Sequence, residues 1–464
     1  MTRTPYRELP TAARDRLGIS VGHVNAVVRI VIRPFSHTLT YEEANHLRTR
    51  STWPYTKVST SSSSPIPDIA VNRPHGQDSS VALGDGPTPM RCHSSRTPVR
   101  PSPVRPAPRP QVSAPAVEDH DPWAPVPVEG GVMTETFYLA WWNVENLFDE
   151  ENAPPDRRPE KVARAVGRDL AGWTPALRDR KIAQLASVIA QMNTATGPDL
   201  LGVCEIENRF VLDLLTTAVH QLLPGRNYGI AHADTDDARG IDVAFLYDTT
   251  KLTAPADEIF FHTVMRRNAT REIVQVNFDT AAGNTWAVFG NHWPSRSGGR
   301  WESAGYRDIA GETLGYFHDR VLEMHGPATP VLAMGDFNDE PFDTSLVTHA
   351  GSVRQADKVV NADTARLWNL SWPIMGTGHD GEPDGTFYFD NEPNQLDQFL
   401  INKNMIIHDR PLHARPDTMQ ILRFPGTSHP GDYPRPIPFG GMGKPVNPNG
   451  YSDHFPIGIL IDET

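Results

Sequence analysis

The sequence predicts a mixed α/β fold in which β-sheets and helices pack in layers. Between residues 137 and 223, apolar runs of strand length alternate with amphipathic helical segments. Between residues 241 and 290, three strand-like runs follow one another through turns, without helices between them. This change from crossover units to hairpins favours a mixed, layered fold over a purely parallel one. Several apolar runs also end on polar side chains, as buried strands do at the rim of a sheet.

Two strand–helix units open the predicted domain. Residues 137–142 form an aromatic strand, and the Thr-Pro pair at 174–175 has the residue types favoured at an N-cap and in a first helical turn. The apolar residues that follow fall mostly on one helical face, whereas Arg178 and Lys181 fall off it, and a Gly-Pro pair ends the helix. A second buried strand and a second amphipathic helix are predicted at 199–204 and 212–223.

The later elements alternate less regularly. Four short apolar runs predict strands at 241–247, 273–278, 286–290 and 331–334, and a helix is predicted at 306–324. Two further runs, 387–389 and 396–401, predict a hairpin, and a last strand is predicted at 455–461. Before that strand lies a Pro- and Gly-rich loop from about 411 to 449, longer than compact domains usually carry without a functional reason.

Residues 1–132 have a different composition. They hold nearly half of the 43 prolines, a serine tract at 59–64 and a Pro/Arg/Val-rich run at 98–110. Such a segment cannot bury enough apolar surface to offset the entropy lost on ordering, so we expect it to be mostly disordered. Residues 24–32 are rich in β-branched side chains but show no partner strand, and an isolated strand is not stable. Met133 precedes the first strong strand, so translation could begin there.

Charge is distributed unevenly between the two parts. Residues 1–132 hold 15 Lys and Arg against 11 Asp and Glu, and residues 133–464 hold 28 against 45, so the net charges are +4 and −17. Tight nonspecific binding to a polyanion requires many Lys and Arg residues, which argues against such binding by the acidic domain. Nucleic acid is not excluded, because a bound divalent cation and a few arginines can reverse the local charge inside one cleft.

Cysteine usage and hydropathy exclude several protein classes. The two cysteines, Cys92 and Cys204, imply neither a disulfide framework nor a cysteine-based zinc site. No signal-peptide pattern opens the chain, and no apolar run is long enough to cross a bilayer. We therefore expect a soluble, cytoplasmic protein without membrane insertion.

Polar residues mark the ends of six predicted strands. In chain order they are Asn143, Glu205, His292, Asp336 with Asn338, Asp397, and Asp453 with His454. Each has an ordinary explanation by itself, such as a turn former, a solvated acid, a satisfied core histidine or a cap. Their joint occurrence at strand ends makes one shared site the better interpretation.

Five motifs give the sequence a resemblance to the endonuclease/exonuclease/phosphatase superfamily. They are Trp142-Asn143-Val144-Glu145-Asn146-Leu147, Leu201-Gly202-Val203-Cys204-Glu205, Gly335-Asp336-Phe337-Asn338, Gln395-Leu396-Asp397 and Ser452-Asp453-His454-Phe455-Pro456. The resemblance covers about residues 133 to 464. It implies a four-layer α/β/β/α sandwich, with two mixed β-sheets packed face to face and helices outside, and Mg²⁺-dependent cleavage of phosphoester bonds.

The residue types at the strand ends agree with a Mg²⁺ site that could also accept Mn²⁺. Hard divalent cations take oxygen ligands, and Mg²⁺ typically uses one or two carboxylates together with water and substrate phosphate. Asn143 and Glu205 would supply such a site, and Asp453 would complete it or hold a second ion. The number of bound ions stays open.

The same resemblance implies the acid–base roles. Asp336 would orient or deprotonate the attacking water, and Asn338 would donate a hydrogen bond to the phosphorane oxygens. His292 and His454 would supply charge to those oxygens or a proton to the leaving group. A carboxylate bonded to a histidine fixes its tautomer and favours the imidazolium, so Asp397 is the expected partner of His454.

Four further residues are assigned around this centre. Asp242 is the candidate that orients His292, because its strand is expected to neighbour that of His292; the alternative is a buried aspartate that caps a turn. Arg271 would contact a substrate phosphate by resemblance. Arg296 and Arg239 are further candidates for substrate binding, although a surface arginine is most often only solvated.

The motifs indicate which type of bond is broken, but they do not identify the substrate. A nuclease is the first hypothesis, and a phosphatase acting on a small-molecule or lipid-head phosphoester is the alternative. The sequence shows no basic, aromatic-rich insertion for entering duplex DNA and no apolar hairpin for a membrane surface. A catalytically inactive binding module is disfavoured because Asn143, Glu205 and His454 are all present. We expect a monomer that acts on a phosphoester, with nucleic acid as a candidate partner.

Overall fold

The computed structural model describes residues 2–5, 24–27, 135–267, 270–375, 384–390, 392–431 and 433–464. The chain divides into two compact units, residues 1–116 and 117–464. In the first unit, β1 (Thr2–Pro5) pairs antiparallel with β2 (Val24–Val27). The expectation that residues 24–32 lack a partner strand is therefore wrong for their first four residues. The rest of residues 1–132, the predicted boundary and Met133 lie outside the described residues.

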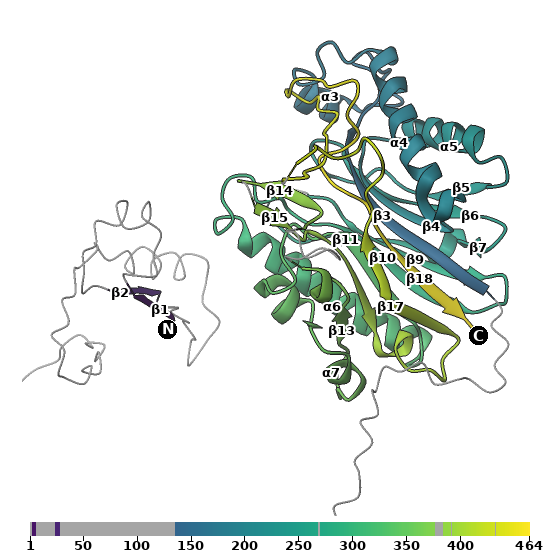
Figure 1. The fold of residues 1–464 in the computed structure, drawn as a ribbon, viewed down its shortest axis with the longest axis vertical. Coiled ribbons are helices and arrows are strands. Elements are labelled where there is room, and N and C mark those ends of the chain that lie inside the picture. The colour runs from purple at the N-terminus through teal and green to yellow at the C-terminus, as the bar shows by residue number, and fades with distance from the viewer. Residues whose placement is uncertain are drawn as a thin grey trace, which may run out of the picture. The chain divides into compact units, whose positions relative to one another are not determined.

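Two mixed β-sheets form the frame of the second unit (Figure 1). The first sheet has the strand order β17-β18-β3-β4-β6-β5. Its strands are β3 (Glu135–Leu147), β4 (Leu200–Ile206), β5 (Tyr228–Ala231), β6 (Asp242–Asp248), β17 (Leu412–Ile421) and β18 (Ile457–Glu463).

The second sheet has the order β12-β13-β16-β11-β10-β9-β7, and β8 also pairs with β9. Its strands are β7 (Leu252–Thr253), β8 (Ile259–His262), β9 (Ile273–Thr280), β10 (Thr285–His292), β11 (Val331–Asp336), β12 (Ser352–Val353), β13 (Leu367–Asn369) and β16 (Asp397–Asn402). A separate hairpin joins β14 (Phe387–Phe389) to β15 (Glu392–Asn394).

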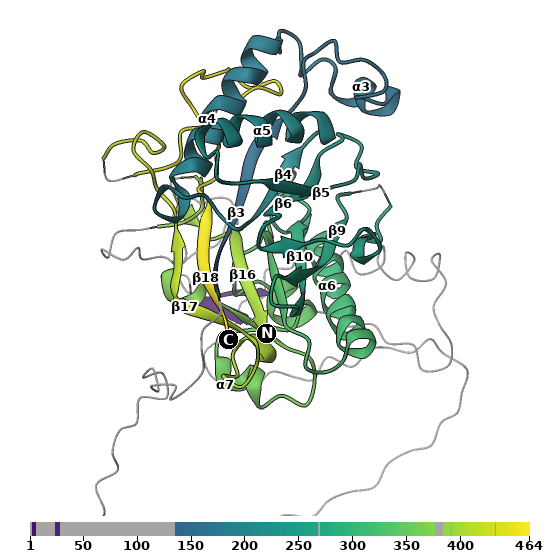
Figure 2. The same ribbon diagram turned by 90° about the vertical axis from the view of Figure 1, so that its right-hand side faces the viewer.

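Apolar side chains fill three interfaces and so create four layers. Along β3, Phe137, Leu139 and Trp141 face the second sheet, because successive side chains of a strand point to opposite faces. The alternate residues pack under α4 (Pro175–Ala195) and α5 (Arg209–Leu222), which cover the outer face of the first sheet (Figure 2). Helix α6 (Ala304–His325) covers the outer face of the second sheet. The predicted α/β/β/α sandwich is confirmed.

Local sequence explains how the helices begin. Thr174 caps α4, whose first residue is Pro175, and the Oδ1 atom of Asn208 accepts a hydrogen bond from the Val211 N–H at the start of α5. Within the described residues, two short helices escaped prediction, α3 (Glu160–Val166) and α7 (Ala356–Val360). None of the described helices is long and apolar enough to cross a bilayer.

Two positions of α4 correct the predicted helical face. Arg178 and Lys181 were expected on the polar side, yet both are buried. Arg178 forms an ion pair with Asp149 at 2.8 Å, and the Lys181 ammonium lies 5.0 Å from the Phe439 ring centroid. The polar side of α4 is covered by the loops after β3 and β17, which the periodicity of the helix cannot reveal.

Two further elements differ from prediction. Residues 387–389 and 396–401 do not pair as a hairpin, because β14 pairs with β15 while β16 pairs with β11 and β13. The predicted loop from 411 to 449 begins with an edge strand, β17, so the irregular part starts at about residue 422. The alternation in β17 is weak because its outer residues are polar, which is why composition suggested a loop.

Candidate active site

The polar strand ends gather at one edge of the sandwich. Strand β3 runs parallel to β4, and β10 runs parallel to β11, so the carboxyl ends of each pair lie together. In register, His292 pairs with Asp336, and Asp336 pairs with Asp397 on β16. The two sheets meet where the Nδ2 of Asn143 donates to the Oδ2 of Asp336 at 3.1 Å. The predicted convergence of strand ends is present.

Asp336 lies at the centre of the cluster. Its Oδ1 accepts a hydrogen bond from the backbone N–H of Asn338 at 2.9 Å, and its Oδ2 lies 3.8 Å from His292 Nε2 and 3.9 Å from His454 Nε2. Burial raises the pKa of Asp336 to about 6, although the charge of His454 opposes the increase. An aspartate with this pKa is ionised at neutral pH and is a stronger base than an exposed one.

His454 and Asp397 form a buried hydrogen-bonded pair. The His454 Nδ1 lies 2.7 Å from the Asp397 Oδ2, and the Asp397 Oδ1 accepts a hydrogen bond from Trp141 Nε1 at 3.0 Å. Burial alone lowers the pKa of His454, but the charges of Asp397 and Asp336 raise it to about 10. The predicted partner of His454 is therefore the one that the geometry provides. The ligand atoms of Asp336, Asp397 and His454 lie within 4.8 Å of one another, so without an ion the three side chains form a compact ionic group.

The environment of His292 differs from that of His454. Its Nε2 lies 3.8 Å from the Glu205 Oε1, and its buried Nδ1 has no hydrogen-bond partner among the described residues. Burial, together with the nearby charges of Arg271 and Arg239, lowers the pKa of His292 well below its usual range. The site thus holds one charged and one neutral histidine.

Asp242 does not orient His292. Its Oδ2 lies 3.3 Å from His232 Nε2, and its Oδ1 accepts hydrogen bonds from the N–H and the hydroxyl of Thr235 at 3.1 and 2.6 Å. The expected pairing is wrong because both carboxylate oxygens of Asp242 are directed to His232 and Thr235, and β6 is not the strand neighbour of β10. The alternative interpretation, a buried aspartate that caps a turn, fits its contacts with Thr235.

The three candidate arginines differ in exposure and in the partners that their guanidinium groups already have. Arg271 is buried, donates to the Trp293 carbonyl at 2.7 Å and lies 3.6 Å from Asp237, while its Nε has no hydrogen-bond partner among the described residues. The side chain of Arg239 is 48% exposed and lies 3.9 Å from Asp237. Arg296 donates to the Asn338 carbonyl at 2.7 Å and pairs with Asp343 at 3.1 Å. Arg271 and Arg239 can therefore meet an anion, whereas Arg296 holds neighbouring loops together.

The expected metal ligands lie beside this cluster. The Oδ1 of Asn143 accepts the Glu145 N–H at 3.0 Å, and the Oε2 of Glu205 accepts the Asn146 N–H at 2.9 Å, which orients both oxygens. The Oδ2 of Asp453 lies 3.4 Å from the Lys444 ammonium. The side chain of Glu205 is 16% exposed and is therefore not fully enclosed by the protein. An oxygen-only donor set of this kind fits a hard divalent cation.

Backbone strain is concentrated at the same edge. Glu145, Asn146, Glu205 and Asn338 have positive φ angles of 51°, 56°, 65° and 50°, a region that non-glycine residues enter at a cost. Gly335 explains how the strands approach so closely, because a Cβ atom there would lie 2.4 Å from the Asn291 carbonyl oxygen. The surrounding structure therefore holds these side chains in conformations that an isolated strand end would not adopt.

Sequence reasoning missed a buried support for the Asn143 strand end. The Glu145 Oε2 accepts backbone N–H groups of Phe439 and Gly440 at 2.8 and 3.2 Å, and the Lys181 ammonium donates to the Glu145 carbonyl. Burial raises the pKa of Glu145 to about 7 and lowers the pKa of Lys181. The long loop is thereby fixed to β3 at the residue two positions beyond Asn143. The glutamate within the Asn-Val-Glu-Asn motif could have indicated this buried support.

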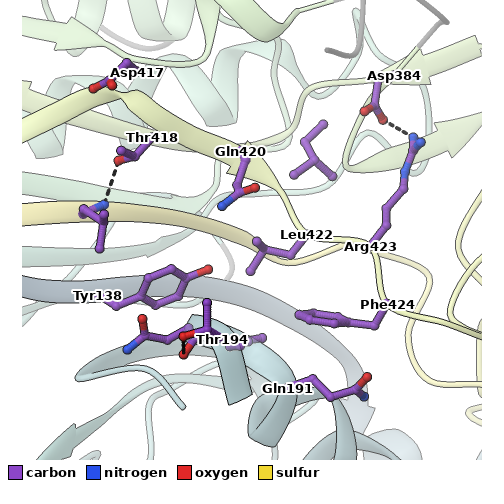
Figure 3. Close-up of a pocket in the computed structure, with 14 residues that line it drawn as sticks. Tyr138, Gln191, Thr194, Asp384, Asp417, Thr418, Gln420, Leu422, Arg423 and Phe424 are labelled. Atoms are coloured by element: carbon purple, nitrogen blue, oxygen red, sulfur yellow. Dashed lines mark hydrogen bonds and ion pairs between the residues drawn. The ribbon is translucent and has the colours of Figure 1, made fainter. Parts of the chain in front are cut away.

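A large open pocket lies away from these residues. Its volume is about 810 Å³, and it lies between the end of α4 and the outer face of β17 and β18 (Figure 3). Tyr138, Leu422 and Phe424 provide its apolar surface, and Arg423 pairs with Asp384 at its side. None of the strand-end residues line it, so this pocket is separate from the Asp336 cluster.

Comparisons with known proteins give a family match and several similar folds. A family model described as Endonuclease/Exonuclease/phosphatase family matches residues 138–463. No curated protein matches the chain. Similar solved structures include an endonuclease/exonuclease/phosphatase family protein of Bacteroides thetaiotaomicron, with 15% identity, a TM-score of 0.42, and coverage of 71% of this chain and 98% of that one.

Two further structures have similar scores. The mannosyl-6-phosphatase of Bacteroides thetaiotaomicron has 17% identity and a TM-score of 0.40, and the match covers 70% of this chain and 99% of that one. Truncated Caenorhabditis elegans TDP2 has 15% identity and a TM-score of 0.40, with coverage of 71% and 98%. These similarities are too distant to indicate a substrate.

Proposed function

Because the chain belongs to the endonuclease/exonuclease/phosphatase family, we propose that it hydrolyses phosphodiester bonds with a divalent cation and that nucleic acid is its substrate. The observation that carries the proposal is the position of Asp336, whose Oδ2 lies 3.8 and 3.9 Å from the Nε2 atoms of His292 and His454. A carboxylate between two imidazoles suits a reaction in which a water loses a proton while negative charge grows on phosphate oxygens.

A cation would be held by Asn143, Glu205 and Asp453, and Mg²⁺ is the ion that we propose, with Mn²⁺ as a substitute. When bound, such an ion neutralises phosphate charge and polarises the phosphorus–oxygen bond. The hydrogen bonds from the Glu145 and Asn146 N–H groups to Asn143 and Glu205 support this assignment, because they fix the direction of the ligand oxygens.

In this mechanism Asp336 accepts the proton of the attacking water, as its raised pKa of about 6 favours. The Nδ2 of Asn338 donates one hydrogen to the Trp293 carbonyl at 3.0 Å, so its second hydrogen can reach a phosphate oxygen. Arg271 provides a fixed positive charge, and neutral His292 provides an N–H donor.

His454 acts at the leaving group. Its charged form, maintained by Asp397, stabilises the departing oxygen or gives it a proton as the phosphorus–oxygen bond breaks.

The test uses the full chain with Mg²⁺ or Mn²⁺ and two substrate sets, plasmid or oligonucleotide DNA and a panel of phosphomonoesters. We expect cleavage of DNA, and loss of cleavage in the His454→Ala variant. A second candidate function, a phosphatase for small phosphoesters, is favoured by the net charge of −17 on residues 133–464. Turnover of a phosphomonoester without any cleavage of DNA would select that candidate and reject the nuclease.

A further inference from the structure

The β14–β15 hairpin carries aromatic side chains to the side of His454. The hairpin lies at the end of the sandwich near the loop that follows β17 (Figure 1). Its base is fixed, because the Thr386 hydroxyl accepts the N–H groups of Leu396 and Asp397 at 3.2 and 3.1 Å. The Thr386 carbonyl accepts the N–H of Phe455 at 2.8 Å. The hairpin is therefore tied to the same two segments that carry Asp397 and His454.

Its three aromatic residues divide between two faces. Tyr388 packs its ring 5.0 Å from the Tyr433 ring, and its hydroxyl accepts a hydrogen bond from Arg423 at 3.0 Å. Phe387 lies on the opposite face, where its ring centroid is 4.8 Å from that of His454. Because side chains alternate along a strand, Phe389 shares the face of Phe387 and lies about 7 Å further along it.

Phe389 has an exposed aromatic ring close to the candidate site. It is 70% exposed, so its ring is available to a ligand, and it stands two residues from a ring that touches His454. Scattered exposed apolar residues are common and need no explanation. Two aromatic rings on one face beside a phosphoester site form a surface on which a planar ligand can stack.

We propose that Phe387 and Phe389 stack the bases of single-stranded nucleic acid that flank the reacting phosphate. The inference rests on the proposed function and specifies its substrate class. Stacking on aromatic side chains contributes to binding without neutralising phosphates, which suits a domain with a net charge of −17. A duplex presents no free base face unless it is unpaired, so it would be the poorer substrate.

Charged side chains of the hairpin argue against a lipid membrane as its ligand. Asp390 and Glu392 are exposed at the turn of the hairpin, where they would resist burial in the apolar region of a lipid membrane. A base that stacks on Phe389 leaves those carboxylates in water. The hairpin therefore favours nucleobases over acyl chains.

The test compares two single strands of equal length, one of thymidines and one in which base-free tetrahydrofuran units replace the interior nucleotides. Wild-type protein should cleave the thymidine strand with the higher kcat/KM. Phe389→Ala should raise KM for the thymidine strand about 5- to 150-fold with kcat largely retained, which is the range expected for loss of one stacked base. Phe389→Trp should restore KM.

The exposed Met324, near the end of α6, provides the matched control, because Met324→Ala also removes an exposed apolar side chain. The Met324→Ala variant should cleave both strands with the same kcat/KM as wild type. Equal kcat/KM for the two strands in wild type would overturn the inference while leaving nuclease activity intact. Cleavage of neither strand, with turnover of phosphomonoesters, would instead reject the proposed nuclease function. Sedimentation of wild type, but not Phe389→Ala, with phosphatidylcholine–phosphatidylserine vesicles would assign the hairpin to a membrane and also overturn the inference.

Discussion

Replacing Asp397 by Asn removes the charge that maintains the His454 imidazolium. With a pKa of about 10, His454 is almost fully protonated at pH 7. Burial lowers this pKa, and Asp397 is the foremost group that opposes the decrease. Even a return to the ordinary value of about 6.5 would leave only roughly a quarter of the molecules charged at pH 7.

The loss of charge would reduce kcat only about fourfold by itself. An Asn side chain that keeps the Trp141 hydrogen bond would present its amide N–H to the His454 Nδ1, which then has to accept and cannot carry a proton, so the imidazolium is disfavoured beyond the loss of the carboxylate charge. We therefore expect Asp397→Asn to lower kcat about 10²- to 10⁴-fold, with KM near normal. Because the imidazolium then forms only at lower pH, the basic limb of the pH–rate profile should move toward acid.

The assay is steady-state cleavage of an oligonucleotide between pH 5 and 10, with thermal melting as the control for folding. The double variant Asp397→Asn with His454→Ala should be little slower than either single variant, since residues that act as one unit are not additive. If the two losses multiply, Asp397 acts through something other than His454. An unchanged pH profile for Asp397→Asn would also refute the reasoning.

Three more predictions test separate parts of the account. Glu205→Gln should weaken Mn²⁺ binding by at least about tenfold in calorimetric titration without changing the melting temperature, and equal affinity would remove Glu205 from the ligand set. In metal-free protein, NMR should show His454 protonated up to about pH 10 and His292 neutral at pH 7, and a neutral His454 at pH 8 would contradict the charge assignment. Deletion of residues 1–132 should change neither melting temperature nor activity, and a loss of several degrees would show that this segment packs on the domain.

The strand-end residues could be predicted because their signal is local. An apolar run that stops at Asn143, Glu205 or Asp336 indicates a buried strand reaching a rim, and parallel neighbours bring such ends together. The Asp397–His454 pair was expected because the family resemblance implies the roles of these residues. The motifs that carry the resemblance include both residues.

Other features depend on contacts between distant segments. Asp242 was linked to His292 because their strands were expected to be neighbours, but β6 and β10 lie in different sheets and Asp242 contacts His232 and Thr235 instead. Arg296 has nothing in its local sequence to indicate that it holds the Asn338 carbonyl and Asp343. Lys181 has the spacing of a surface residue, and its burial depends on a loop that contributes Phe439, more than 250 positions later.

The hairpin at residues 387–394 also depends on contacts between distant segments. Its apolar residues predicted a strand, but pairing it with residues 396–401 was wrong because Asp397 continues into the second sheet beside β11. The contact between Phe387 and His454 is a consequence of that arrangement. A pattern of alternating side chains identifies the shared face of Phe387 and Phe389, yet the structure is needed to place that face beside the site.

Cation dependence tests the central claim most directly. The measurement is the rate of single-stranded oligonucleotide cleavage by the full chain in Mg²⁺, in excess chelator, and after Mg²⁺ is restored, with Asp336→Asn in parallel. The account predicts cleavage in Mg²⁺, none in chelator, recovery on adding the ion back, and a loss of kcat of about 10²-fold or more for Asp336→Asn. Full turnover in excess chelator, or an Asp336→Asn variant as fast as wild type, would contradict it.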